Sequence, residues 1–326
     1  MKVQKNVLYS AILVIVIVVA ALSYYAVVVK PKSGKIEQTP IAEPEWFVDS
    51  GGILHYTQER GDVLFSRQNY NETDALLISK MVYKSKGTNI YGLLVQPKEA
   101  SGLLPGVVLL PGAGVSKESE LDLAKKIAFL GIVVLTIDQR GVGETDGEFP
   151  SLNDDFITFS NGQEPVQYLM VYDALRGFDL LKSAPFVDPG KIIMAGESLG
   201  GRIAVMAAAI DPDVNSVLAI SSAGINFKEG EDAKVNLFMN SLDSDRYIGS
   251  ISPRKVVFIH NLYDKSIPIN YTVKTLSNAK MPKSLLVIND TKCNHGYCDG
   301  MYAAVVDSMN YLVGVRATVE VVQKQQ

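Results

Sequence analysis

Short apolar runs alternate with amphipathic segments along most of the chain, and the apolar runs are rich in valine, isoleucine and leucine, as expected for strands buried on both faces of a sheet. These runs lie at residues 105–110, 132–137, 191–195, 217–220, 256–259 and 284–288. Apolar residues at helical spacing predict helices between the strands. These helices lie at residues 121–130, 164–181, 201–209 and 300–313. The alternation predicts an α/β fold, with a mostly parallel sheet covered by helices on both faces.

A β-hairpin is predicted at residues 81–95, before this alternation begins. Two β-rich arms flank the segment Lys-Gly-Thr-Asn at residues 86–89, which is typical of a turn. Residues 46–78 follow no clear period, so the sequence predicts no element there. The length and the pattern together indicate one large α/β domain over residues 46–326.

Residues 7–29 form a separate apolar segment that contains no charged side chain. A helix of this length is about 34 Å long, which is enough to cross a hydrocarbon core of about 30 Å. A cleaved signal peptide has a shorter apolar region and a small-x-small site after it, and this segment has neither. We therefore expect a single-pass membrane anchor over residues 1–30, which contacts the lipid bilayer through residues 7–29, and a proline-containing linker over residues 31–45.

The orientation of the anchor is less clear from the sequence, because lysines flank the apolar segment on both sides. The short lysine-containing tail before it resembles the start of an export signal, so we expect the large domain to lie outside the cytoplasm. Cys293 and Cys298 are the only cysteines. Their spacing allows a small disulfide outside the cell, and two free thiols fit the sequence equally well.

The composition limits the partners of the protein. Hydrophobic residues make up 47% of the chain, which is enough for a large core, and the formal net charge is −4. An excess of negative charge argues against nucleic acid as a partner. No pattern that we identify specifies the oligomeric state.

The segment Gly196-Glu197-Ser198-Leu199-Gly200 lies between a predicted strand and a predicted helix. A serine in G-x-S-x-G at such a junction lies on a sharp turn that exposes its hydroxyl group at the helix N-terminus. Side chains in place of the flanking glycines would clash with the neighbouring strand and helix. We therefore predict that Ser198 is a nucleophile.

A serine hydroxyl is a weak nucleophile and needs a base, which histidine supplies most often. Of the three histidines, His295 lies in a loop after a predicted strand, whereas His260 lies at a strand end and His55 precedes the core. A carboxylate must fix the tautomer of the base. We predict Asp264 for this role because it follows a strand and comes between the serine and His295 in the chain, with Asp290 as the competing acid.

Acyl transfer also needs donors that face the developing oxyanion. We expect one of them to be the backbone N–H of Leu199, the residue after the nucleophile. The second should come from the small residues at positions 111–114. Ala113 is the first choice for this donor and Gly114 is the alternative.

These motifs resemble the α/β-hydrolase superfamily, and in particular the branch with dienelactone hydrolases, acetyl xylan esterases and prolyl oligopeptidase-like enzymes. The resemblance covers residues 80–315 with the order of elements intact. The segments that carry it are an entry strand at 91–97, a D-x-R-G-x-G-x-T turn at 138–145, the nucleophile region at 187–201 and the acid loop at 260–268. The chain differs from dienelactone hydrolases in having serine rather than cysteine as nucleophile.

The resemblance implies a serine hydrolase that cleaves carboxylic esters or other activated acyl bonds of a small molecule or short peptide through an acyl-serine intermediate, with no cofactor and no metal. Two alternatives remain open at this point. One is an acylaminoacyl or dipeptidyl-type serine peptidase, and the other is a non-catalytic binding module on a hydrolase scaffold. Residues 222–253 are expected to form a small cap that influences the choice of substrate.

Overall fold

The computed structural model describes residues 45–99, 101–149 and 151–316. The chain divides into residues 1–44 and a compact unit that begins at Glu45, and every described residue belongs to the second unit. The predicted membrane anchor at residues 7–29 therefore lies outside the described residues. Within the described ranges, no helix combines the length and the apolar character that a membrane span requires.

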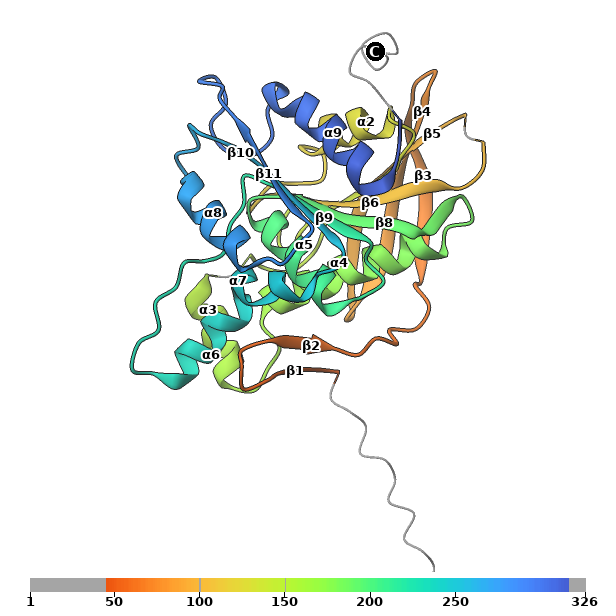
Figure 1. Ribbon diagram of the computed structural model, residues 1–326. Coiled ribbons are helices and arrows are strands. Elements are labelled where there is room, and N and C mark those ends of the chain that lie inside the picture. Colours follow the sequence, from red (N-terminus) through yellow and green to blue (C-terminus); the bar gives the residue numbers. More distant parts are fainter. Residues whose placement is uncertain (1–44, 100, 150, 317–326) are drawn as a thin grey trace, which may run out of the picture. The chain divides into compact units, whose positions relative to one another are not determined.

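The described part of the chain contains one large sheet, in the strand order β11-β10-β9-β8-β6-β7-β5-β4-β3 (Figure 1). Strands β6 to β11 are parallel to their neighbours, and β5, β4 and β3 are added antiparallel beyond β7. The strands are β3 (Phe65–Glu72), β4 (Leu76–Ser85), β5 (Thr88–Pro97), β6 (Leu104–Leu110), β7 (Val133–Ile137), β8 (Val187–Glu197), β9 (Ser216–Ile220), β10 (Lys255–Asn261) and β11 (Lys283–Ile288). A separate two-stranded sheet pairs β1 (Trp46–Val48) with β2 (Leu54–Tyr56).

Helices cover both faces of the large sheet (Figure 1). Alternate residues of the buried strands face opposite sides, so Val108 packs in the core with α4 and α5, whereas Val107 packs with α2 and α9. The helices are α2 (Leu121–Ala128), α3 (Leu152–Ser160), α4 (Val166–Ser183), α5 (Leu199–Ile210), α6 (Ala233–Leu242), α7 (Ser244–Tyr247), α8 (Ile269–Asn278) and α9 (Tyr302–Val313), with short 3-10 helices η2 (Ile248–Ser250) and η3 (Asp299–Met301).

The structure confirms the predicted α/β-hydrolase architecture. All six predicted strands are present as β6 to β11, and the four predicted helices are α2, α4, α5 and α9. The predicted hairpin is β4 and β5, whose turn residues Lys86 and Gly87 both have positive φ angles, of 44° and 80°. The sequence analysis did not predict β1 to β3, α3 or α6 to α8.

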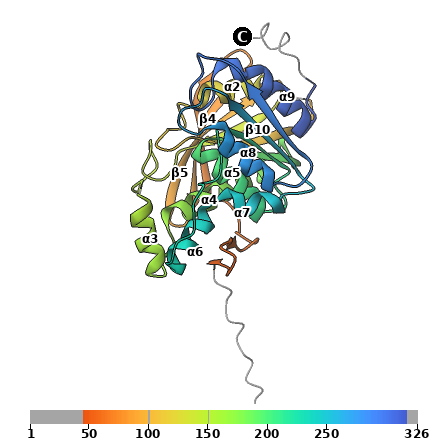
Figure 2. The same cartoon turned by 60° about the vertical axis from the view of Figure 1, so that its left-hand side comes forward.

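Helices α3 and α6 lie side by side at one end of the domain (Figures 1 and 2). Their contact is aromatic, because the ring of Phe238 lies 5.7 Å from that of Phe156 and 5.4 Å from that of Phe159. The region predicted as a cap, residues 222–253, contains α6, α7 and η2. The segment that leads into α3 and the loop after β9 both reach the cavity described below.

Candidate active site

Ser198 lies on a strained turn between β8 and α5. Its φ and ψ angles are 50° and −115°, and a non-glycine residue adopts a positive φ only where the surrounding structure enforces it. The N–H of Ser198 donates to the carbonyl oxygen of Ile220 at 2.9 Å, and its own carbonyl accepts from the hydroxyl of Ser222 at 2.7 Å. The backbone is thus fixed from both sides, while the serine hydroxyl has no hydrogen-bond partner among the described residues.

Glycines make this turn sterically feasible. A Cβ atom on Gly200 would lie 2.1 Å from the carbonyl oxygen of Leu110, and one on Gly196 would lie 2.4 Å from the backbone of Gly200. Both distances are far below van der Waals contact, and the opposing atoms belong to the backbone. The flanking glycines of the motif are therefore required by the close packing of β6, β8 and α5, as the sequence analysis expected.

His295 and Asp264 are hydrogen-bonded to each other. Nδ1 of His295 lies 2.8 Å from Oδ2 and 3.1 Å from Oδ1 of Asp264. A carboxylate only accepts, so Nδ1–H is the donor and Nε2 carries the free lone pair of the neutral ring. The Asp264 side chain is fully buried, and its Oδ1 also accepts the N–H groups of Ser266 and Ile267, each at 2.9 Å. These two N–H groups hold the Asp264 carboxylate in position, and the carboxylate in turn orients the imidazole of His295.

The histidine loop lies against the nucleophile turn. The N–H of Tyr297 donates to Oε2 of Glu197, the residue before Ser198, at 2.8 Å. The carbonyl oxygen of Gly296 accepts from the hydroxyl of Ser221 at 3.2 Å. Since β8, β9, β10 and β11 are parallel, their carboxyl ends share one edge of the sheet. Ser198, Asp264 and His295 follow β8, β10 and β11, so all three lie at the same end of the domain.

The other two histidines are not placed to act as the base. His260 is fully buried, with Nε2 at 2.8 Å from the carbonyl oxygen of Ile267 and Nδ1 at 2.9 Å from the hydroxyl of Thr272. Burial lowers the pKa of His260. His55 pairs with Asp49 and stacks on Phe47 in the β1–β2 hairpin. His260 therefore stabilises the acid loop, and His55 belongs to a surface element.

Asp290, the competing acid, does not contact His295. Its Oδ1 accepts the N–H of Lys292 at 2.9 Å within its own loop. That loop also contains the disulfide between Cys293 and Cys298, whose Cα atoms are 5.8 Å apart. The disulfide links the two ends of the segment that carries His295. The two cysteines are therefore paired in the structure and are not free thiols.

The two residues predicted to supply oxyanion donors, Leu199 and Ala113, both lie beside Ser198. Leu199 is the first residue of α5, and Ala113 lies in the loop after β6, and both line one cavity with Ser198. Among the described residues, the N–H of Ala113 has no acceptor, whereas the N–H of Gly114 points to Oε1 of Gln139 at 3.4 Å. Of the two candidates for the second donor, the geometry favours Ala113.

Gln139 holds the loop after β6 in place through hydrogen bonds, a role that the sequence alone did not indicate. Its Nε2 donates to the carbonyl oxygen of Pro111 at 2.9 Å, and its Oε1 faces Gly114. Asp138, in the same turn, accepts from the backbone N–H and from Nζ of the buried Lys117, both at 2.8 Å. The D-x-R-G-x-G motif is thus a structural support for the loop after β6.

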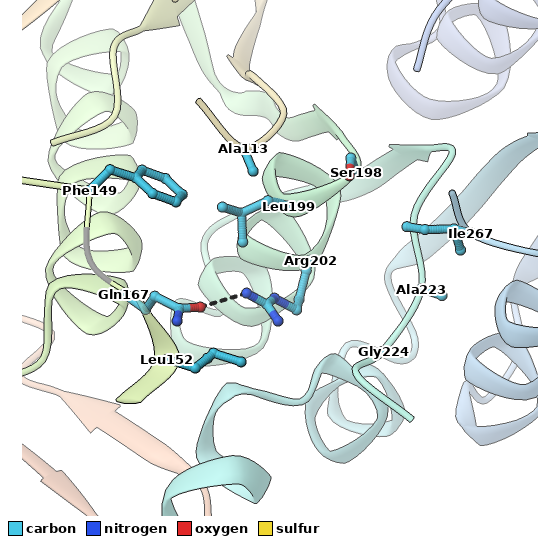
Figure 3. A pocket seen from close by; sticks show the side chains of 10 residues that line it. All are labelled: Ala113, Phe149, Leu152, Gln167, Ser198, Leu199, Arg202, Ala223, Gly224 and Ile267. Carbon is cyan, nitrogen blue, oxygen red and sulfur yellow. Dashed lines mark hydrogen bonds between the residues drawn. The ribbon is translucent and has the colours of Figure 1, made fainter. Parts of the chain in front are cut away.

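Ser198 opens into a cavity of about 300 Å³ (Figure 3). This volume is at the lower end of the range for small-molecule sites. Its walls are mostly apolar, and Gln167 and Arg202 supply the polar groups besides Ser198. The lining residues are Ala113, Phe149, Leu152, Gln167, Ser198, Leu199, Arg202, Ala223, Gly224 and Ile267. In the part of the chain that is described, no group of three or more His, Cys, Asp or Glu residues is arranged to hold a metal ion.

Two carboxyl groups lie beside each other next to the nucleophile turn. Glu120, just before α2, is 3% exposed, and Glu197, the residue before Ser198, is half-buried. Burial, together with the negative charge of Glu197, raises the pKa of Glu120 to about 9. Burial also raises the pKa of Glu197. Because neighbouring carboxylates do not both ionise readily, the pair keeps one proton at neutral pH, and Glu120 holds it.

We expect Glu120→Gln to make the free energy of unfolding less dependent on pH. In the unfolded chain Glu120 ionises near its usual value of 4.5, but in the folded protein it keeps its proton up to about pH 9. The folded state therefore binds more protons across this window. Wild-type stability should fall as the pH rises through it, by up to about 1.4 kcal/mol per pH unit.

Urea unfolding at pH 6 and pH 9 measures this slope. Glutamine does not ionise, so the variant should show a shallower slope than the wild-type protein. Glu59→Gln, at an exposed position, is the matched control and should keep the wild-type slope. Equal slopes for all three proteins would show that Glu120 does not retain its proton.

Comparison with known proteins agrees with this fold. The acetyl xylan esterase (AXE1) family matches residues 57–229, more than half of the chain, and the chain belongs to this family. An acetyl xylan esterase from Paenibacillus sp. R4 superposes with a TM-score of 0.64 at 19% identity, over 77% of this chain and 88% of that chain. A putative dienelactone hydrolase from Klebsiella pneumoniae superposes with a TM-score of 0.55 at 16% identity, over 78% of this chain and 100% of that chain. The predicted membership of the α/β-hydrolase superfamily, in the branch with these enzymes, is confirmed.

Curated relatives match over shorter stretches. Acetyl esterase Axe7A of Xylanibacter ruminicola is 32% identical over 142 residues, which is 40% of this chain and 32% of the relative. The uncharacterized protein YfhR of Escherichia coli K12 is 25% identical over 168 residues, which is 48% of this chain and 51% of the relative. The matched segments thus span about a third to a half of these relatives.

Proposed function

We propose that the protein is a carboxylic ester hydrolase that acts through an acyl-Ser198 intermediate. The observation that carries this proposal is the 2.8 Å hydrogen bond between His295 and the buried Asp264, at the same sheet edge as the strained Ser198 turn. Membership of the acetyl xylan esterase family supports ester bonds as the target. The cavity of about 300 Å³ favours a short acyl group such as acetyl.

The proposed reaction has two acyl-transfer steps. Ser198 Oγ attacks the ester carbonyl carbon while Nε2 of His295 takes the hydroxyl proton, and the carbonyl oxygen becomes an oxyanion. The N–H groups of Leu199 and Ala113 donate to this oxyanion, and Asp264 stabilises the imidazolium. The C–O bond to the alcohol then breaks, and His295 returns its proton to the leaving oxygen. Water attacks the acyl-serine in the same way and releases the acid.

Hydrolysis of para-nitrophenyl acetate, compared with that of an aminoacyl para-nitroanilide, tests this proposal. The proposed ester hydrolase should turn over the acetate with a kcat/KM at least a hundredfold above that for the anilide. Faster turnover of the anilide would instead support the peptidase alternative. Turnover of neither substrate, together with no reaction of Ser198 with a fluorophosphonate, would support a non-catalytic scaffold.

We also propose that residues 7–29 anchor the protein in a membrane, with the hydrolase domain outside the cytoplasm. The uncharged length of that segment supports the anchor. The disulfide between Cys293 and Cys298 supports an oxidising compartment. A membrane-impermeant fluorophosphonate should label the protein in intact cells. Labelling only after cell lysis would place the domain on the other side.

A further inference from the structure

Arg202 is a half-buried cation in the wall of the candidate substrate cavity (Figure 3). It lies four residues after Ser198, and its backbone N–H donates to the Ser198 carbonyl at 3.2 Å. Ser198 and Arg202 both line the same cavity of about 300 Å³. A substrate that fills this cavity from Ser198 can therefore reach the guanidinium.

Four other buried or half-buried arginines have partners that balance their charge or accept from their N–H groups. Arg60, Arg140 and Arg176 each form an ion pair with an aspartate. Arg254 donates to three backbone carbonyls. Among the described residues, Arg202 has no carboxylate within ion-pair distance, and its one side-chain hydrogen bond goes to Oε1 of Gln167 at 2.6 Å.

Gln167 positions Arg202 without neutralising it. The backbone N–H of Gln167 donates to the buried carboxylate of Asp155 at 3.0 Å, which fixes this residue at the start of α4. The amide oxygen of Gln167 accepts from the guanidinium of Arg202 at 2.6 Å (Figure 3). A neutral amide fixes the direction of the guanidinium and leaves its positive charge uncompensated.

The charge of Arg202 persists at neutral pH. Burial lowers the pKa of Arg202 to about 10, and the nearest opposing influence is the carboxylate of Asp243. Asp243 accepts the N–H groups of Ile225 and Asp245 and forms no ion pair with Arg202. A cation in a mostly apolar wall with no ion-pair partner can be balanced by a bound anion. The cavity is the open side from which such an anion could come.

We propose that Arg202 binds a carboxylate of the substrate, so that the preferred ester carries a carboxylate a few bonds from its carbonyl carbon. The planar guanidinium matches the two oxygens of a carboxylate. The apolar side chains of Leu152, Leu199 and Ile267 would contact the short carbon chain between the two groups. This inference rests on the proposed function, because it uses the cavity into which Ser198 opens.

Two pairs of esters test the inference and locate the carboxylate. In the first pair, mono-para-nitrophenyl adipate carries a carboxylate in its acyl part, and para-nitrophenyl hexanoate is the neutral ester for comparison. In the second pair, para-acetoxybenzoate carries the carboxylate in its alcohol part, and para-acetoxybenzamide is the neutral ester. In at least one pair, the wild-type kcat/KM should favour the anionic ester by tenfold or more. Arg202→Met should lower this anionic-to-neutral ratio at least tenfold, and Arg202→Lys should lower it less.

Arg246→Met is the matched control, because Arg246 lies at the surface in an ion pair with Glu229 and does not line the cavity. It should keep the wild-type ratio. The inference is overturned if neither pair favours the anion, or if Arg202→Met keeps the ratio while Ser198 still reacts with a fluorophosphonate. Cleavage of neutral esters without any preference for the anionic ones refutes this inference but leaves the proposed function standing. Failure to cleave any ester refutes the proposed function.

Binding measured without turnover gives a second test that does not depend on catalysis. Monomethyl adipate, titrated into the Ser198→Ala protein in a calorimeter, should bind at least tenfold more tightly than dimethyl adipate. Adding Arg202→Met should remove this difference. Equal binding of the two compounds to Ser198→Ala would contradict a carboxylate site at Arg202.

Discussion

Ser198→Ala is expected to lower kcat for ester hydrolysis by about 100,000-fold, or about 7 kcal/mol of transition-state stabilisation. The variant lacks the oxygen that forms the acyl-enzyme, while the N–H groups of Leu199 and Ala113 remain in place. Release of para-nitrophenol measures the loss, followed by stopped flow for the wild-type protein and over hours for the variant. Because the hydroxyl has no hydrogen-bond partner among the described residues, the midpoint of thermal unfolding should stay within a few degrees of wild type.

Ser277→Ala is the control for this variant, since Ser277 is an exposed residue of α8 that bonds only within its helix. It should keep full activity. A Ser198→Ala protein that retained a tenth or more of the wild-type rate would exclude Ser198 as the nucleophile.

Asp264→Asn is expected to lower kcat by about 10,000-fold. The asparagine amide would present a donor or a neutral oxygen to Nδ1 of His295, so it would no longer select the tautomer with a free lone pair on Nε2. It would also fail to stabilise the imidazolium. The readout is kcat for para-nitrophenyl acetate, with near-ultraviolet circular dichroism to check that the fold is retained.

Asp290→Asn provides the matched comparison, because Asp290 lies in the histidine loop but contacts Lys292 rather than His295. Its kcat should stay within threefold of wild type. If Asp290→Asn had the large effect and Asp264→Asn the small one, the acid would be Asp290, contrary to the observed pairing.

The order of the site residues could be predicted because the sheet topology dictates it. Each buried strand was recognisable from its valine and isoleucine content, and parallel strands place the loops after them at one edge. Ser198, Asp264 and His295 each follow such a strand. The contact between His295 and Asp264 then follows from the adjacency of β10 and β11.

Helices α3 and α6 could not be predicted in the same way. Phe156 and Phe159 of α3 pack on Phe238 of α6, about eighty residues away in the chain. A pattern search finds helices that cover a sheet more readily than helices that cover each other.

Polar groups inside the site were also missed, for a different reason. An arginine on a helix usually reaches solvent, so nothing local distinguishes Arg202 from a surface residue. Its spacing of four from Ser198 was the one available signal. Gln139 and Glu120 depend on partners in other loops, and only the tertiary structure shows that they support the loop after β6 and the nucleophile turn.

Peptide mapping after reaction with a fluorophosphonate tests the central claim most directly, because the reagent modifies only a serine that a neighbouring base activates. The wild-type protein should carry one adduct, on the peptide that contains Ser198, and Asp264→Asn should react far more slowly. An unmodified Ser198, or an adduct on a different serine such as Ser222, would contradict the proposed arrangement of Ser198, His295 and Asp264.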